Sequence, residues 1–165
     1  MTFKIGGNYR YARKKEPSVS EIDGLPNFTH ITYTPNRPLV QLERGINTIA
    51  GVDASDGFRC PAILVSSSPH KIGTSDTPWQ DFFDPDNGHI LYFGDNKENG
   101  VDPASKRGNK ALFHQFQLHN SPDMRLRSLA APILFFKRVT VDGRVKGNVQ
   151  FQGFGIVSGA QLITQ

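Results

Sequence analysis

Short apolar segments alternate with turn-forming residues in the first half of the chain. The stretch 28–34, Phe-Thr-His-Ile-Thr-Tyr-Thr, is rich in aromatic and β-branched residues and predicts a strand. Segments 39–42 and 46–49 predict shorter strands by the same criterion. The apolar run 61–65 is β-branched and short, which predicts a buried strand rather than a helix.

Helical spacing occurs in the second half. Residues 109–119 place Leu112 and Phe116 four positions apart, so we predict a helix with Asn109 as its N-cap. The Ser-Pro-Asp sequence that opens 121–129 predicts a second, short helix.

The longest strand patterns follow these helices. Residues 131–141 and 149–157 predict two paired strands joined by a tight turn at Asp142-Gly143, and 162–164 predicts the start of another strand. Many strands with one or two helices predict an α+β fold: a curled, barrel-like and mostly antiparallel β-sheet with flanking helices.

Composition limits the classes of protein to which the chain can belong. Its 165 residues suit a single domain, and 16 Gly with 11 Pro argue against a helical bundle or coiled coil. Twelve Phe and 37% hydrophobic residues exclude wholesale disorder. No apolar run approaches the roughly 18 residues of a membrane span, and no signal peptide opens the chain. We therefore expect no membrane partner. The single Cys60 excludes an internal disulfide framework and fits the cytosol.

The net charge of +4 permits a polyanionic partner without requiring one. Basic residues gather in an N-terminal arm, at the start of the predicted helix and beside the Asp142-Gly143 turn. A cationic helix N-terminus suits a phosphate, and a hairpin tip flanked by arginines has the shape to probe a groove. The alternatives are solvated charged faces and a protein-interaction domain whose basic surface is incidental.

The segment 73–97 is the densest in chemically useful side chains. It holds the sole Trp of the chain and five Asp, and its Asp-Pro-Asp-Asn-Gly sequence predicts a hairpin turn. Such a hairpin would bring Trp79 and Tyr92 to one open end, beside Asp95. An extruded nucleobase needs stacking surfaces and polar groups for its Watson–Crick edge, and a carboxylate can accept from the N4 donor of cytosine. The plainer alternative is two half-buried core aromatics and a turn-capping carboxylate.

The same segment contains a rival motif. Pro85-Asp86 followed by Asp95-Asn96-Lys97 matches the PD-(D/E)-x-K pattern of metal-dependent nucleases. An extended run from His89 to Asp95 would separate its ends by about 20 Å at roughly 3.3 Å per residue. Carboxylates that share one metal ion must lie far closer, since each metal–oxygen bond is only about 2.0–2.6 Å. We expect the histidines and Cys60 to be structural, and we expect no metal and no cofactor.

Several motifs carry a resemblance to a known family. Trp79, the run 84–97 and Gly108–Leu112 resemble the N-terminal recognition domain of modification-dependent restriction endonucleases of the AspBHI and MspJI type. Segments 61–69 and 150–157 extend this likeness over most of the chain. The region 79–112 is also similar, more distantly, to the SRA (SET and RING-associated) domain. Its acidic stretch, Gly, Tyr-x-Gly turn and Gly-Asn-Lys are matched in order by Asp84, Gly88, Tyr92-Phe93-Gly94 and Gly108-Asn109-Lys110.

The resemblance implies that the chain binds double-stranded DNA containing 5-methylcytosine, or a related modified cytosine, and flips that base into a pocket. Trp79 and Tyr92 would be the stacking walls. Asp95 would read the cytosine edge beside Asn96, with Asp81 or Asp84 as alternatives. The SRA pattern has small polar residues where this chain has Asp95-Asn96-Lys97, so the identity of the reading acid stays open. The residues expected at the DNA backbone are Arg10, Arg13, Lys14, Lys97, Lys106, Arg107, Lys110, Arg138 and Arg144.

The nuclease of that family lies in a separate C-terminal domain. The resemblance therefore implies that residues 1–165 are a single non-catalytic recognition domain taken from a longer chain of the prokaryotic cytosol. A C-terminal nuclease domain would be its covalent partner, and a homo-oligomer could form through the parent protein.

Overall fold

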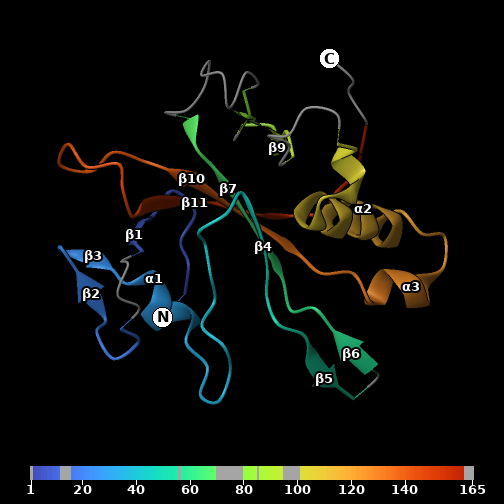
Figure 1. Ribbon diagram of the computed structural model, residues 1–165, viewed down its shortest axis with the longest axis horizontal. Coiled ribbons are helices and arrows are strands. Elements are labelled where there is room, and N and C mark those ends of the chain that lie inside the picture. Colours follow the sequence, from blue (N-terminus) through green and yellow to red (C-terminus); the bar gives the residue numbers. More distant parts are fainter. Residues whose placement is uncertain are drawn as a thin grey trace.

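A five-stranded β-sheet forms the centre of the computed structural model, which describes residues 2–11, 16–55, 57–69, 80–84, 86–94 and 101–161 (Figure 1). The strand order is β1-β11-β10-β7-β4. Neighbouring strands are antiparallel except β7 and β10, which are parallel. The strands span Asn8–Arg10 (β1), Ile46–Thr48 (β4), Ile63–Ser67 (β7), Ile133–Arg138 (β10) and Asn148–Gly155 (β11).

Two apolar clusters cover the two faces of this sheet. On one face Leu64 and Phe136 pack with Phe28 of helix α1 (Phe28–Thr32) and with aromatic residues near the N-terminus. On the other face Ile63 and Ile133 pack with Leu112 of helix α2 (Arg107–His119). Successive strand residues point to opposite faces, so the apolar runs of β7 and β10 serve both clusters. The result is a sheet between two layers.

The remaining elements are short and peripheral to the sheet. Helix α3 (Met124–Ser128) follows α2, and a 3-10 turn, η2 (Pro103–Ser105), precedes it. Three small hairpins complete the described fold: β2–β3 (Glu21–Ile22, Leu25–Pro26), β5–β6 (Val52–Ala54, Gly57–Arg59) and β8–β9 (Phe82–Asp84, His89–Leu91). None of the described helices is long and apolar enough to cross a membrane.

The sequence correctly predicted several strands of the sheet and the two helices of the second half. The strands expected within 46–49 and 61–65, the paired strands within 131–141 and 149–157, and both helices are confirmed. The Asp142-Gly143 turn is confirmed as well, because both residues have positive φ, at 48° and 73°. The strand expected at 162–164 lies outside the described residues.

The strand predicted over 28–34 is wrong, because α1 occupies this stretch. Asn27 caps the helix, its side-chain oxygen accepting from the N–H of Thr29 at 3.0 Å. The same side chain donates to the carbonyl oxygens of Glu16 and Val19 at 2.8 Å each, which anchors the helix start. Phe28 is fully buried among aromatic rings. Capping and burial thus override the strand preference of the β-branched residues.

Two other sequence predictions about local structure are wrong. Segment 39–42 is irregular chain that buries Leu42 without forming a strand. Helix α2 has Lys106 as its N-cap, so Asn109 is its third residue rather than its cap. The preceding turn η2, capped by Asp102, runs directly into α2 and starts the helix early.

The fold is α+β and mostly antiparallel, as predicted. In the described part of the chain, β1 and β4 are the two edges of the sheet and no ladder joins them. Barrel-like closure is therefore not observed among these residues.

Candidate functional site

The β8–β9 hairpin forms where the sequence predicted it. Phe82 pairs with Leu91 and Asp84 with His89. At the tip, the Asp84 carboxylate accepts from the backbone N–H of Asn87 at 3.2 Å and from its side-chain amide at 2.8 Å. These bonds favour the ionised carboxylate and lower the pKa of Asp84. Asp84 is therefore a turn-closing residue.

The open end of the hairpin brings Asp81 next to the residues that follow β9. Its carboxylate accepts from the backbone N–H of Phe93 at 2.9 Å. Tyr92 is half-buried here and packs against the apolar cluster that contains Ile63 and Ile133. The structure thus brings Asp81 and Tyr92 together and leaves Asp84 at the opposite end of the hairpin. Trp79, Asp95 and Asn96 lie outside the described residues.

The start of α2 packs tightly against this open end. A Cβ added to Gly94 would collide with the side-chain amide of Asn109. A Cβ added to Gly108 would lie 2.9 Å from the Cβ of Ile46 on β4. The amide nitrogen of Asn109 donates to the carbonyl oxygen of Pro103 at 3.0 Å. The Tyr-x-Gly and Gly-Asn-Lys sequences, distant along the chain, therefore meet in space.

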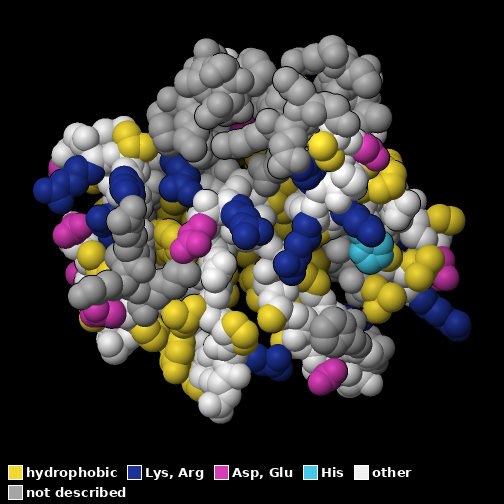
Figure 2. Space-filling view, in the orientation of Figure 1, with side chains coloured by type: hydrophobic (Ala, Val, Ile, Leu, Met, Phe, Trp, Pro, Cys, Tyr) yellow, Lys and Arg dark blue, Asp and Glu magenta, His cyan; other side chains and the backbone are white. Residues whose placement is uncertain are grey.

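Three basic residues belong to this same junction. Lys106 is half-buried at the N-cap, whereas Arg107 and Lys110 in the first turn of α2 are exposed. That turn contains no acidic residue. The N-terminal end of a helix carries partial positive charge and unpaired N–H groups, so this end attracts anions. On the face drawn in Figure 2, Lys and Arg side chains extend from the β10–β11 end of the molecule to α2.

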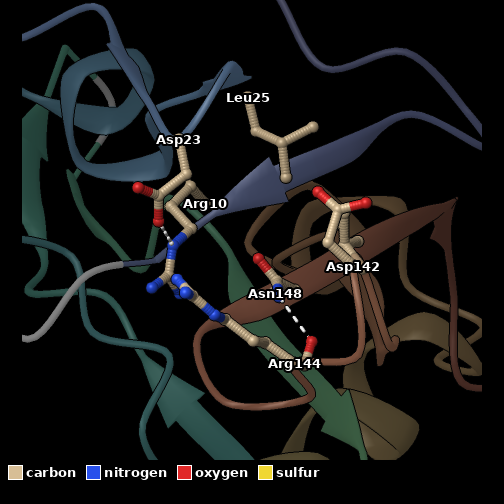
Figure 3. A pocket seen from close by; sticks show the side chains of 7 residues that line it. Arg10, Asp23, Leu25, Asp142, Arg144 and Asn148 are labelled. Atoms are coloured by element: carbon tan, nitrogen blue, oxygen red, sulfur yellow. Dashed lines mark hydrogen bonds and ion pairs between the residues drawn. The ribbon is translucent and has the colours of Figure 1, made fainter.

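A hollow of about 200 Å³ lies between two Asp-Gly turns, away from the β8–β9 hairpin (Figure 3). Asp23-Gly24 joins β2 to β3, Asp142-Gly143 closes the β10–β11 hairpin, and all four residues have positive φ. The hollow is lined by Arg10, Asp23, Leu25, Val141, Asp142, Arg144 and Asn148. The sequence predicted the Asp142-Gly143 turn but not its approach to the β2–β3 turn, which depends on how β1 pairs with β11.

The arginines near this hollow differ in burial and in the hydrogen bonds they donate within the protein. Arg10 forms an ion pair with Asp23 at 2.9 Å, donates to the carbonyl oxygen of Lys146 at 2.8 Å, and is only 17% exposed. Arg138 donates to the carbonyl oxygen of Leu42 at 3.3 Å. Arg144 is exposed at the turn. Arg13, Lys14 and Lys97 lie outside the described residues.

The metal-site alternative gains no support from the described residues, among which no group of three His, Cys, Asp or Glu could hold an ion. Asp86 is exposed at the hairpin tip, while Asp95 and Lys97 lie outside the described residues. The Nδ1 atom of His119 accepts from the N–H of Val157 at 3.1 Å, and burial lowers the pKa of this imidazole. Burial raises the pKa of the Cys60 thiol, which opposes a role as a nucleophile.

Comparison with known proteins identifies similar domains. The sequence profile described as restriction endonuclease AspBHI N-terminal matches residues 31–165. The MspJI restriction endonuclease in complex with a 27-mer oligonucleotide has 38% sequence identity and a TM-score of 0.81, covering 93% of this chain and 36% of that one. The DNA recognition domain of the cytosine modification-dependent restriction endonuclease LpnPI has 20% identity and a TM-score of 0.60, covering 96% and 62%, and shows a shared fold. No curated protein matches the sequence. The chain spans about a third of the MspJI chain.

Proposed function

The chain belongs to the family of restriction endonuclease AspBHI N-terminal domains, and from this premise we propose that it binds double-stranded DNA containing 5-methylcytosine or a related modified cytosine. In this proposal the modified base leaves the duplex and enters a pocket at the open end of the β8–β9 hairpin. The chain is the non-catalytic recognition domain of a modification-dependent restriction endonuclease. The proposal rests chiefly on the junction where Gly94, two residues after half-buried Tyr92, packs against Asn109 in the cationic first turn of α2.

The pocket roles follow from position and chemistry. Trp79 and Tyr92 are the stacking walls, and Asp95 accepts from the exocyclic N4 group of the cytosine, next to Asn96. Asp81 is the alternative reader at this end of the hairpin, where its carboxylate accepts from the N–H of Phe93 and has further lone pairs. Asp84 is less suited to this role, since it closes the far tip of the hairpin.

Affinity for the DNA backbone comes from the exposed cations. Arg107 and Lys110 flank the helix N-terminus, and Arg144 lies at the turn between β10 and β11. Lys106, Arg13, Lys14 and Lys97 belong to the same proposed set. Arg10 and Arg138, which donate to internal acceptors, orient the surface that the others present. Neutralised phosphates release counterions, so binding should weaken steeply with salt.

The partners of the parent protein belong to the proposal as well. MspJI is a restriction endonuclease, and this chain covers 36% of it. We therefore propose a C-terminal nuclease domain as the covalent partner of this domain and assembly of the parent protein into a homo-oligomer. Hydrolysis by a PD-(D/E)-x-K site in this chain is the rival hypothesis, and no described contact favours it.

A gel-shift comparison tests the proposed function. Duplexes of one sequence carrying cytosine, 5-methylcytosine or 5-hydroxymethylcytosine are titrated with the protein at two salt concentrations. We expect tighter binding to at least one modified duplex and weak, salt-sensitive binding to the unmodified one. Equal affinity for all three duplexes would overturn the proposal. Cleavage with Mg²⁺ that is abolished by Asp95→Asn would favour the nuclease hypothesis instead.

A further inference from the structure

The tight contact between Gly94 and Asn109 holds the end of β9 in place. We propose that Asn109 is a positioning residue that sets the geometry of the modified-base pocket by bracing residues 92–94. This inference rests on the proposed function, because it concerns the same pocket. It assigns to Asn109 an effect on specificity without contact with the base.

The contacts around Gly94 come from two sides. On the hairpin side, Asp81 accepts from the N–H of Phe93 at 2.9 Å. On the helix side, the Asn109 amide occupies the space that a side chain at position 94 would need. The segment 92–94 is therefore held between a hydrogen bond and a packed amide. Tyr92 itself packs on the apolar cluster of the sheet, so its ring has a rigid base.

Asn109 is itself firmly held. Its amide nitrogen donates to the carbonyl oxygen of Pro103 at 3.0 Å, which ties α2 to the turn η2 before it. Its neighbour Gly108 lies so close to Ile46 that the first turn of α2 rests directly on β4. Asn109 therefore connects the segment after β9 to the central sheet.

This arrangement links the two proposed parts of the DNA interface. Arg107 and Lys110 flank Gly108-Asn109, so the residues proposed to hold phosphates and the residue that braces residues 92–94 share one turn of helix. Binding geometry is sensitive to displacements of about 0.5–1 Å. A new Cβ at position 94 would require either this segment or the Asn109 amide to move. A disturbed contact should therefore reduce discrimination between bases more than it reduces affinity for DNA in general.

The test is a double-mutant cycle on the full chain with Gly94→Ala, Asn109→Ala and the double variant. The readouts are the affinity ratio between 5-methylcytosine and cytosine duplexes, the affinity for the unmodified duplex, and the thermal midpoint. We expect Gly94→Ala to lower the ratio by about tenfold or more, with little change for unmodified DNA. Asn109→Ala alone should lower the ratio less, and adding it to Gly94→Ala should restore the ratio to that of Asn109→Ala. This single variant also keeps the test valid if Gly94→Ala does not fold.

Lys110→Ala is the matched control in the same helical turn. Because Lys110 is proposed to contact phosphate, its loss should weaken binding to both duplexes alike and leave the ratio unchanged. The inference is overturned if Asn109→Ala alone keeps the wild-type ratio, if Gly94→Ala keeps it, or if adding Asn109→Ala fails to rescue Gly94→Ala. A wild-type ratio of one would overturn the proposed function together with this inference, whereas a high wild-type ratio without coupling would overturn the inference alone.

Discussion

The carboxylate of Asp81 accepts a hydrogen bond from the backbone N–H of Phe93 at 2.9 Å, across the open end of the β8–β9 hairpin. This bond gives Asp81 a structural task in the same place where a base-reading acid is expected. Hydrogen bonds already assign structural tasks to two of the three candidate acids. Asp81 braces the hairpin, Asp84 closes its tip, and Asp95 is the one proposed to read the base.

Substitution of each acid by Ala should separate these roles. We expect Asp95→Ala to lose about 1–3 kcal/mol of discrimination, the usual worth of a specific base contact, and to keep weak non-specific binding. Asp84→Ala should keep discrimination, because its side chain lies at the other end of the hairpin. Gel-shift titration with methylated and plain duplexes measures both. Loss of discrimination in Asp84→Ala with none in Asp95→Ala would reverse the assignment.

Exposed and internally bonded cations should respond differently to neutralisation. Arg107→Gln and Arg144→Gln should each reduce the slope of log affinity against log salt by about 0.9, the value for one lost phosphate contact. The ratio between modified and plain DNA should not change. Affinity measured over a series of NaCl concentrations gives the slope, and an unchanged slope in both variants would remove them from the interface.

Arg10→Gln is the matched comparison beside Arg144. Because Arg10 is mostly buried and bonded to Asp23 and to the Lys146 carbonyl, we expect its loss to lower the thermal midpoint. Its salt slope should stay close to that of the wild type. A large slope change without loss of stability would show that Arg10 contacts phosphate directly.

Replacing Gly108 by Ala should have two opposing effects on stability, a gain in helix propensity and a loss in packing. Alanine in a helix is favoured over glycine by about 1 kcal/mol. The new Cβ would lie 2.9 Å from the Cβ of Ile46, however, and overpacking of this kind typically costs about 1–3 kcal/mol. We expect a net loss of stability, measured as a lower urea midpoint. A stabilised variant would mean that α2 is free to shift away from β4.

The partial burial of His119 should make the free energy of unfolding depend on pH. Burial is the larger influence and lowers its pKa, while a backbone hydrogen bond with Ala131 acts in the opposite direction. The native state therefore favours the neutral ring, whose Nδ1 accepts from Val157. Stability from this group is complete above the ordinary histidine pKa of about 6.5 and is lost as pH falls through the lowered native value.

His119→Asn tests this dependence, because the asparagine oxygen can replace Nδ1 as an acceptor without titrating. The free energy of unfolding should fall more between pH 8 and pH 5.5 in the wild type than in the variant, with pH values chosen around the ordinary histidine pKa. Parallel curves for the two proteins would contradict the role given to His119.

The sequence predicted the second half of the fold well because its signals there are local. Asp142-Gly143 needs only its own positive φ to define the hairpin, and the spacing of Leu112 and Phe116 defines a helix face. The strand prediction for 28–34 was wrong because the helix formed there depends on contacts with residues elsewhere in the chain. The Asn27 side chain donates to the carbonyl oxygens of Glu16 and Val19, and Phe28 packs edge-to-face against Phe136 of a remote strand.

The sequence was enough to predict the hairpin of the candidate site, but not how that hairpin packs against α2. The Asp-Pro-Asp-Asn-Gly turn indicated the hairpin, which the structure confirms. The sequence interpretation placed Trp79 and Asp95 beside Tyr92, however, and gave Asp81 only as an alternative reading acid. The packing of Asn109 against Gly94 was not predictable, because it requires knowing that α2 begins at Arg107 and rests on β4. The sequence pattern predicted Asn109 as the helix N-cap, whereas its side chain packs against Gly94.

The parallel pairing of β7 with β10 has a consequence for how the domain reaches its native state. Ile63 pairs with Ile133, so the centre of the sheet can form only after the whole connection between Ser67 and Ile133 has closed. That connection contains β8, β9, α2 and α3, and therefore the candidate site. Closing so long a loop is slow relative to local pairing. The segment proposed to read DNA thus lies within the loop that this central strand pairing must close.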